Sequence, residues 1–100
     1  MMASGGPSPE RTELTSELTR LDRQLRDLSD QWEAVEREIV QKIARRRELI
    51  ARQEESAEDH TDEINRLQSD VFALRDRLSN LRDAHFDFSA LYRILQQARA

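Results

Sequence analysis

Apolar residues recur at alternating intervals of three and four along most of this chain. In the second half the series runs without a slip through Ile64, Leu67, Val71, Leu74, Leu78, Leu81, His85, Phe88, Tyr92 and Leu95. In the first half the same spacing connects Leu14, Leu18, Leu21, Leu25, Leu28, Trp32, Val35 and Ile39. This is the heptad pattern, which places the a and d residues on one stripe of an α-helix. Such a stripe must be covered by another helix, so the sequence predicts an all-α coiled coil.

Between these two series the pattern weakens. Continuing the first series places Lys42 and Arg46 at seam positions, where apolar residues are expected. A shift of four residues instead connects apolar residues at seven-residue intervals: Ile43, Ile50, Ala57 and Ile64. An insertion of four residues is a stutter, which unwinds a coiled coil locally without ending the helix. We therefore predict a stutter after Ile39 and a thin, half-polar seam in the middle of the chain.

The weak middle leaves two architectures open: a long antiparallel helical hairpin, or one continuous helix of about 85 residues in a parallel coiled coil. Charge favours the hairpin, because helix C-termini prefer basic side chains and helix N-termini acidic ones. Basic residues lie before the predicted turn, and acidic residues lie within it and directly after it: Lys42, Arg45, Arg46, Arg47 and Arg52, then Glu58, Asp59, Asp62 and Glu63. Ser56 or Thr61 can cap the second helix.

The predicted domain is a single helical unit over residues 10–100, preceded by a tail over 1–9. The helices are expected over about 12–55 and 62–86, with the turn over about 56–62 and a short third helix over about 88–98. All Gly and Pro residues lie in the first nine positions, so we expect that tail to be disordered. With the turn centred near Asp59, Trp32 should face His85, Phe86 and Phe88 in an aromatic cluster.

Near the C-terminus apolar residues spread beyond the heptad stripe, through Phe86, Phe88, Leu91, Tyr92, Ile94 and Leu95. A broad apolar surface must be covered by the hairpin itself, by a second copy or by a partner. A two-helix hairpin also has too small a core to be comfortably stable alone. The sequence therefore predicts oligomerisation, with a four-helix bundle of two hairpins as the simplest form.

Composition narrows the class of function. The net charge of −4 argues against a nucleic-acid or anionic-membrane binder. The absence of cysteine removes disulfides and thiol chemistry. No apolar run approaches membrane-spanning length and the N-terminus lacks a secretory leader pattern, so a soluble intracellular protein is expected, with leaderless export left open.

Three groups of residues could carry chemistry. The run Arg45–Arg47 could contact phosphates, but consecutive residues point to different faces of a helix, which favours a solvated surface. The acids around His60 lack metal-site spacing, and we interpret them as a turn and a helix start. His85, at an a position, is interpreted as a core histidine.

An enzyme alternative rests on Lys42, Arg46 and Gln53 at seam positions. This layout, with Leu21-Asp22 upstream, resembles small all-helical chorismate mutases, which place such side chains inside a helical dimer. The chain departs from them at Trp32, where an Arg would be expected, and lacks their Gly-rich connection. The resemblance implies a polar pocket between Arg46 and Gln53.

The preferred interpretation is a non-enzymatic structural or interaction protein: a scaffold, adaptor or assembly subunit. It would associate with itself, as a dimer first, or with another helical protein, and we expect no nucleic acid, membrane, small-molecule substrate, cofactor or metal. The predicted interface comprises both heptad series and the C-terminal apolar surface formed by Phe86, Phe88, Leu91, Tyr92 and Leu95. A basic-patch nucleic-acid binder remains a further alternative.

Overall fold

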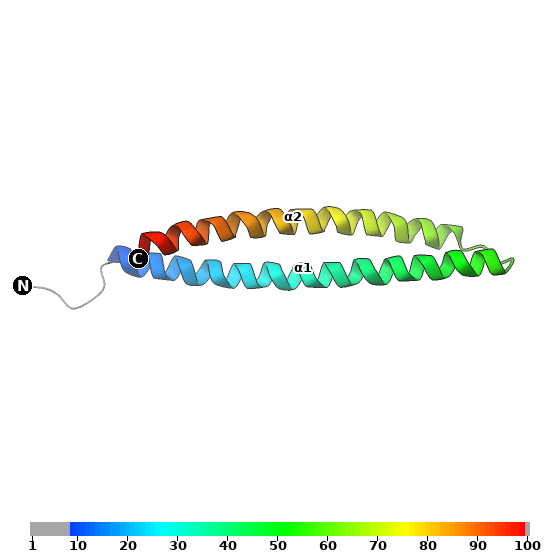
Figure 1. The fold of residues 1–100 in the computed structure, drawn as a ribbon, viewed down its shortest axis with the longest axis horizontal. Helices are drawn as coiled ribbons and strands as arrows, with labels where there is room; N and C mark the ends of the chain where they lie inside the picture. The colour runs from blue at the N-terminus through cyan, green and yellow to red at the C-terminus, as the bar shows by residue number, and fades with distance from the viewer. Residues whose placement is uncertain (1–8, 100) are drawn as a thin grey trace, which may run out of the picture. The chain divides into compact units, whose positions relative to one another are not determined.

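The computed structural model describes residues 9–99, which form an all-α helical hairpin (Figure 1). In these residues the elements are α1 (Pro9–Glu55) and α2 (Thr61–Arg99), joined by a turn. The predicted hairpin is confirmed, and the alternative of one continuous helix is wrong. The predicted N-terminal tail lies outside the described residues except for Pro9, which belongs to α1.

The helix ends carry side chains suited to their positions, and the two ends at the turn have the charges that the sequence predicts. Pro9 lies in the first turn of α1, where its missing N–H is not needed. Arg52 lies in the last turn of α1, and Asp62 and Glu63 lie in the first turn of α2. These charges complement the helix dipoles on either side of the turn. The distribution of charge therefore located the turn correctly.

The chain divides into two compact units, each containing a segment of both helices. We call residues 30–82 the turn unit; here the second part of α1 and the first part of α2 run antiparallel (Figure 1). We call residues 9–29 and 83–99 the terminal unit; it pairs the beginning of α1 with the end of α2. Each unit is described by itself below.

The heptad stripes form the interior of both units. The turn unit buries Val35, Leu49 and Leu81, and the terminal unit buries Leu18 and Leu21. All other members of the two predicted series are half-buried, including His85. The two apolar stripes identified from the sequence therefore face inward, as predicted.

The predicted stutter after Ile39 is wrong. The first series continues unchanged through Lys42 and Arg46, which are half-buried, to Leu49, whose side chain is 0% exposed. Charged residues can occupy these seam positions because partners on α2 accept their hydrogen bonds, as described below. A shift of register is therefore not required.

The separate third helix is also not formed. Helix α2 continues without interruption to Arg99. No Gly or Pro occurs near Phe86–Phe88 to end it. Ser89, near the start of the predicted third helix, is half-buried, and its hydroxyl lies 3.5 Å from His85 Nδ1, one helical turn back. A continuous helix keeps Phe88, Tyr92 and Leu95 on the inward stripe.

Candidate functional site

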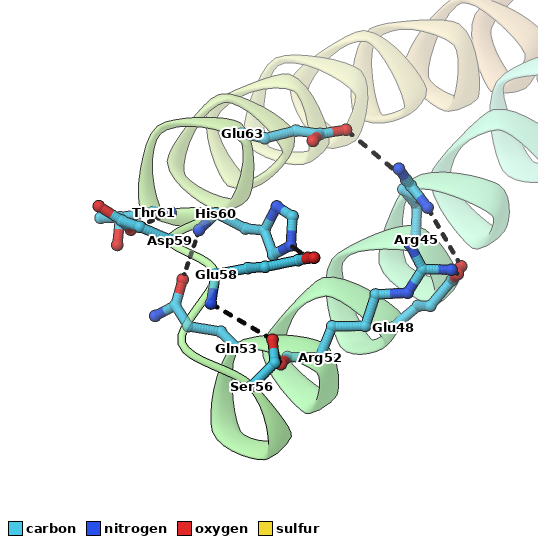
Figure 2. Close-up of polar contacts among 10 residues, drawn as sticks. All are labelled: Arg45, Glu48, Arg52, Gln53, Ser56, Glu58, Asp59, His60, Thr61 and Glu63. Atoms are coloured by element: carbon cyan, nitrogen blue, oxygen red, sulfur yellow. Dashed lines mark hydrogen bonds and ion pairs between the residues drawn. The ribbon is translucent and has the colours of Figure 1, made fainter.

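The turn between the helices is held by hydrogen bonds from its own side chains (Figure 2). Ser56 Oγ donates to the carbonyl oxygen of Arg52 over 2.8 Å and accepts the N–H of Glu58 over 3.3 Å. The side-chain oxygen of Gln53 accepts the backbone N–H of His60 over 2.8 Å. Ser56 therefore closes α1 and does not cap α2, because it lies one residue beyond the end of α1 and reaches the last free carbonyls.

Helix α2 begins with a cap formed by Asp59. Its Oδ1 accepts the N–H of Thr61 over 3.0 Å, and the carbonyl of His60 accepts the N–H of Ile64 over 2.9 Å. Hydrogen bonds from the side chain and backbone of Thr61 lower the pKa of Asp59 below its usual 3.8, and attraction to His60 adds to this effect. Thr61, a predicted cap, is instead the first residue of the helix.

The acidic residues of the turn bind neighbouring side chains. Glu58 Oε2 lies 2.9 Å from His60 Nε2, and Glu63 Oε1 lies 3.6 Å from Arg45 Nε (Figure 2). Within residues 9–99 no group of three or more acidic or histidine side chains is arranged to hold a metal ion. The contact of Glu63 with Arg45 joins α2 to α1, and the contact of Glu58 with His60 lies within the turn.

Two polar contacts cross the seam of the turn unit. Lys42 Nζ lies 3.1 Å from Asp70 Oδ2, and Arg46 Nη2 donates to Gln68 Oε1 over 3.2 Å. The Arg46 Nε atom is buried and has no hydrogen-bond partner among the described residues. Lys42 and Asp70 are equally far in sequence from residue 56, and Arg46 and Gln68 from residue 57. The two antiparallel helices are therefore paired about residues 56 and 57.

The same alignment explains the environment of Trp32. The Arg82 guanidinium lies 5.4 Å from the centre of the Trp32 ring, a cation–π contact whose midpoint is again residue 57. The sequence-based pairing assumed a centre near Asp59, which is too late, because Gln53 holds the start of α2 beside the last turn of α1. Phe86 is 73% exposed and so does not contribute to a buried aromatic cluster.

The basic run does not form a single cationic face. Arg45 contacts Glu48 at 3.4 Å and Glu63 at 3.6 Å, whereas Arg46 donates to Gln68. Arg47 is exposed. A nucleic-acid phosphate would have to displace partners that two of the three arginines already have.

The polar pocket implied by the enzyme alternative would bring Arg46 and Gln53 together. Each instead has another partner: Arg46 donates to Gln68, and Gln53 accepts the backbone N–H of His60. The polar side chains of the seam thus connect one helix to the other at separate levels of the turn unit.

The predicted C-terminal surface divides into two sets of residues within the terminal unit. Phe88, Tyr92 and Leu95 are half-buried on the heptad stripe. Phe86 and Leu91 are exposed, as is Ile94, with exposed fractions of 73%, 40% and 62%. We call Phe86, Leu91 and Ile94 together the C-terminal surface.

A second apolar region lies in the turn unit and was not predicted. A groove of about 210 Å³ is lined by Ile43, Arg46, Gln68, Val71 and Phe72. Phe72 is 54% exposed, and Val40, one turn from Ile43 on α1, is 66% exposed. A sequence signal existed, because both residues are large, apolar and adjacent to a seam position.

Searches of protein-family models, of curated proteins and of solved structures find no match to this chain. Neither helix, over the residues described, has an apolar stretch that could cross a membrane. The proposals below therefore depend on the geometry of the hairpin and on the chemistry of its exposed side chains.

Proposed function

We propose that this chain is a non-enzymatic helical-hairpin interaction protein, serving as a scaffold, adaptor or assembly subunit inside the cell. It acts by helix–helix association, either with itself or with another helical protein. The observation that carries the proposal is the C-terminal surface, where Phe86, Leu91 and Ile94 remain exposed on α2. Apolar side chains grouped in this way are typical of interaction sites.

Phe86 and Ile94 lie two turns apart on one face of α2, and Leu91 lies beside Ile94. Phe86, Ala90 and Ile94 follow one another at intervals of four, and Leu91 is three residues before Ile94. Residues three and four apart lie side by side on a helical surface. A partner helix could therefore cover all three side chains at once and remove them from water, the principal favourable term in association.

The small interior of the hairpin supports the same proposal. The terminal unit buries two side chains, Leu18 and Leu21, and leaves most of its stripe half-buried. Helical domains of this size usually gain stability from further packing or from oligomerisation. Association would add a second layer to the core.

The enzyme alternative receives less support, because Arg46 and Gln53 are engaged separately. The nucleic-acid alternative also receives less support, because Arg45 and Arg46 have partners in their own chain.

The test compares the native chain with a variant that carries Phe86→Ser and Ile94→Ser. Association with itself is measured by sedimentation, and association with a captured helical protein is measured with both components purified. We expect at least one of these associations in the native chain and its loss in the variant, with helicity by circular dichroism unchanged. Both substituted side chains are exposed, so the fold should persist.

The matched control is Gln96→Ser. Gln96 is exposed and lies two residues from Ile94, about 200° around the helix. This control should associate like the native chain. Equal association by the native chain and the double variant would contradict the proposed role of the C-terminal surface.

A further inference from the structure

The exposed face of α1 in the turn unit has a symmetric sequence. Glu36, Val40, Ile43 and Arg47 lie at intervals of four, three and four, so they share one face of the helix. Val40 is 66% exposed, and Glu36 and Arg47 are also exposed. The face thus has an acid at one end, two aliphatic side chains in the centre and a base at the other end. We call these four residues the α1 stripe.

Helix α2 contributes an aromatic ring at the level of the centre of the stripe. Lys42 and Asp70 are in contact at 3.1 Å, so in antiparallel helices Val40 and Phe72 lie at the same level. Phe72 lines the same groove as Ile43 and Val71, and its ring is 54% exposed. The apolar centre of the α1 stripe is therefore widened by Phe72 on the neighbouring helix.

We propose that a second copy of this chain docks on the α1 stripe in antiparallel orientation, with a two-fold axis at the level between Gln41 and Lys42. This inference rests on the proposed function, in which the chain associates through exposed helical surfaces, and it places self-association on the α1 stripe rather than on the C-terminal surface. Residues equidistant from the axis meet, so Val40 faces Ile43 of the second copy. Glu36 then faces Arg47 of the second copy, and the reciprocal pair forms at the other end.

Charge complementarity selects this occupant and this orientation. A copy docked in the same direction would place Glu36 against Glu36 and Arg47 against Arg47, which is repulsive. The antiparallel copy converts both contacts into opposite-charge pairs and places the two Phe72 rings near the axis. Arg37 and Gln41, which also border Val40, lie on the opposite side of it from Ile43.

A two-fold contact of this kind is closed, because the same patch is used by both copies. The stripe extends over about three helical turns. Such a short contact implies a reversible dimer, whose formation should depend on concentration.

The experiment is sedimentation equilibrium of the full chain from about 1 µM to 1 mM, the range in which such weak contacts dissociate. Native chains should dimerise. The single variants Glu36→Arg and Arg47→Glu should each lose at least about tenfold in dimer affinity, because each replaces two attractive contacts by repulsive ones. The chain with both reversals should regain native affinity. An equimolar mixture of the two single variants should also associate, since both contacts then pair opposite charges.

Two further variants complete the test. Glu38→Arg is the matched control, because Glu38 is exposed, lies about 200° around the helix from Glu36 and makes the same change of charge. It should dimerise like the native chain. Phe72→Ser should dissociate the dimer while circular dichroism reports an unchanged helix content.

The inference is overturned if the native chain remains monomeric at every concentration, in which case another protein is the candidate occupant of the stripe. It is also overturned if the single variants Glu36→Arg and Arg47→Glu each dimerise like the native chain. Loss of a native dimer on substitution of Phe86 and Ile94, with no effect of the charge reversals, would refute docking on the stripe and leave the proposed function standing.

Discussion

The two units of the hairpin use different chemistry along the same heptad stripe. In the turn unit the heptad stripe of α1 includes Lys42 and Arg46, which contact Asp70 and Gln68 on α2. In the terminal unit the heptad stripe of α1 consists of leucines: Leu14, Leu18, Leu21, Leu25 and Leu28. Leucines can interdigitate in several alignments, whereas a polar seam residue requires one particular partner. The comparison therefore indicates that the alignment of the helices is specified mainly in the turn unit.

The difference also has an energetic side. A charged residue on the seam costs desolvation, which its partner offsets only in part. The turn unit offsets this desolvation cost by burying Leu49 completely, about one helical turn from Arg46 and from Gln53 along α1. Specification of alignment and gain of stability thus come from different residues of the same stripe.

The largest expected effect comes from Leu49→Ala. Removing a fully buried leucine side chain should lower the free energy of unfolding by about 3 kcal/mol, through lost burial and the cavity left behind. Urea denaturation measures this change, and hydrogen exchange should locate the lost protection in the turn unit. Leu91→Ala, at a 40% exposed leucine of the terminal unit, is the control and should have a much smaller effect. Comparable losses from both substitutions would contradict the burial of Leu49 as the main support of the turn unit.

Leu49 also shows where sequence reasoning reached its limit. The heptad pattern predicted both helices and their inward faces, and the charges around the turn located the fold-back. The pattern did not predict Leu49, because Lys42 and Arg46 at preceding seam positions suggested a change of register. Their hydrogen-bond partners on α2 keep them in the stripe, and those partners become identifiable only when the helices are aligned.

The same alignment limited the prediction of candidate sites. The contact between Trp32 and Arg82 depends on a pairing centred near residue 57, which is set by the hydrogen bond that the His60 N–H donates to the Gln53 side chain. An error of about two residues in that centre moves the pairing by about one helical turn. Exposed residues such as Phe72 were missed for a different reason, since an apolar residue beside the seam can be covered or exposed.

The second prediction concerns Gln53, which should matter to the turn unit alone. Gln53→Ala removes the acceptor for the His60 N–H and should cost about 1 kcal/mol of unfolding free energy, the usual net value of one hydrogen bond. Gln53→Glu keeps an acceptor oxygen and should retain most of the stability. Gln96→Ala, at an exposed position of the terminal unit, serves as the control. Equal stability of the Ala and Glu variants would show that the bond does not support the turn.

A smaller effect is expected for the pair Lys42 and Asp70. Their side chains are 26% and 44% exposed, so solvent screens the attraction and a coupling energy of roughly 0.5 kcal/mol is expected. A double-mutant cycle with Lys42→Met and Asp70→Asn measures it, and added salt should reduce it. A coupling energy well above this value would mean that the Lys42–Asp70 pair supplies stability as well as alignment. That result would remove the distinction drawn between the two units.

The smallest expected effect is the pH dependence contributed by Asp59. The hydrogen bonds of Asp59 with Thr61 lower the pKa of this carboxyl in the folded chain. In acid, the folded chain therefore binds fewer protons at Asp59 than the unfolded chain does. Its contribution to stability is therefore complete above about pH 4, the unfolded pKa, and is lost as the pH falls through the lowered folded pKa.

Asp59→Asn keeps a capping oxygen but cannot titrate in this range. The difference in urea midpoint between the native chain and this variant should therefore shrink from pH 6 to pH 2. Because the carboxylate is exposed, salt should weaken the effect. A difference that stays constant across this range would show that the cap does not depend on the charge of Asp59, and that the turn unit is held by its neutral hydrogen bonds instead.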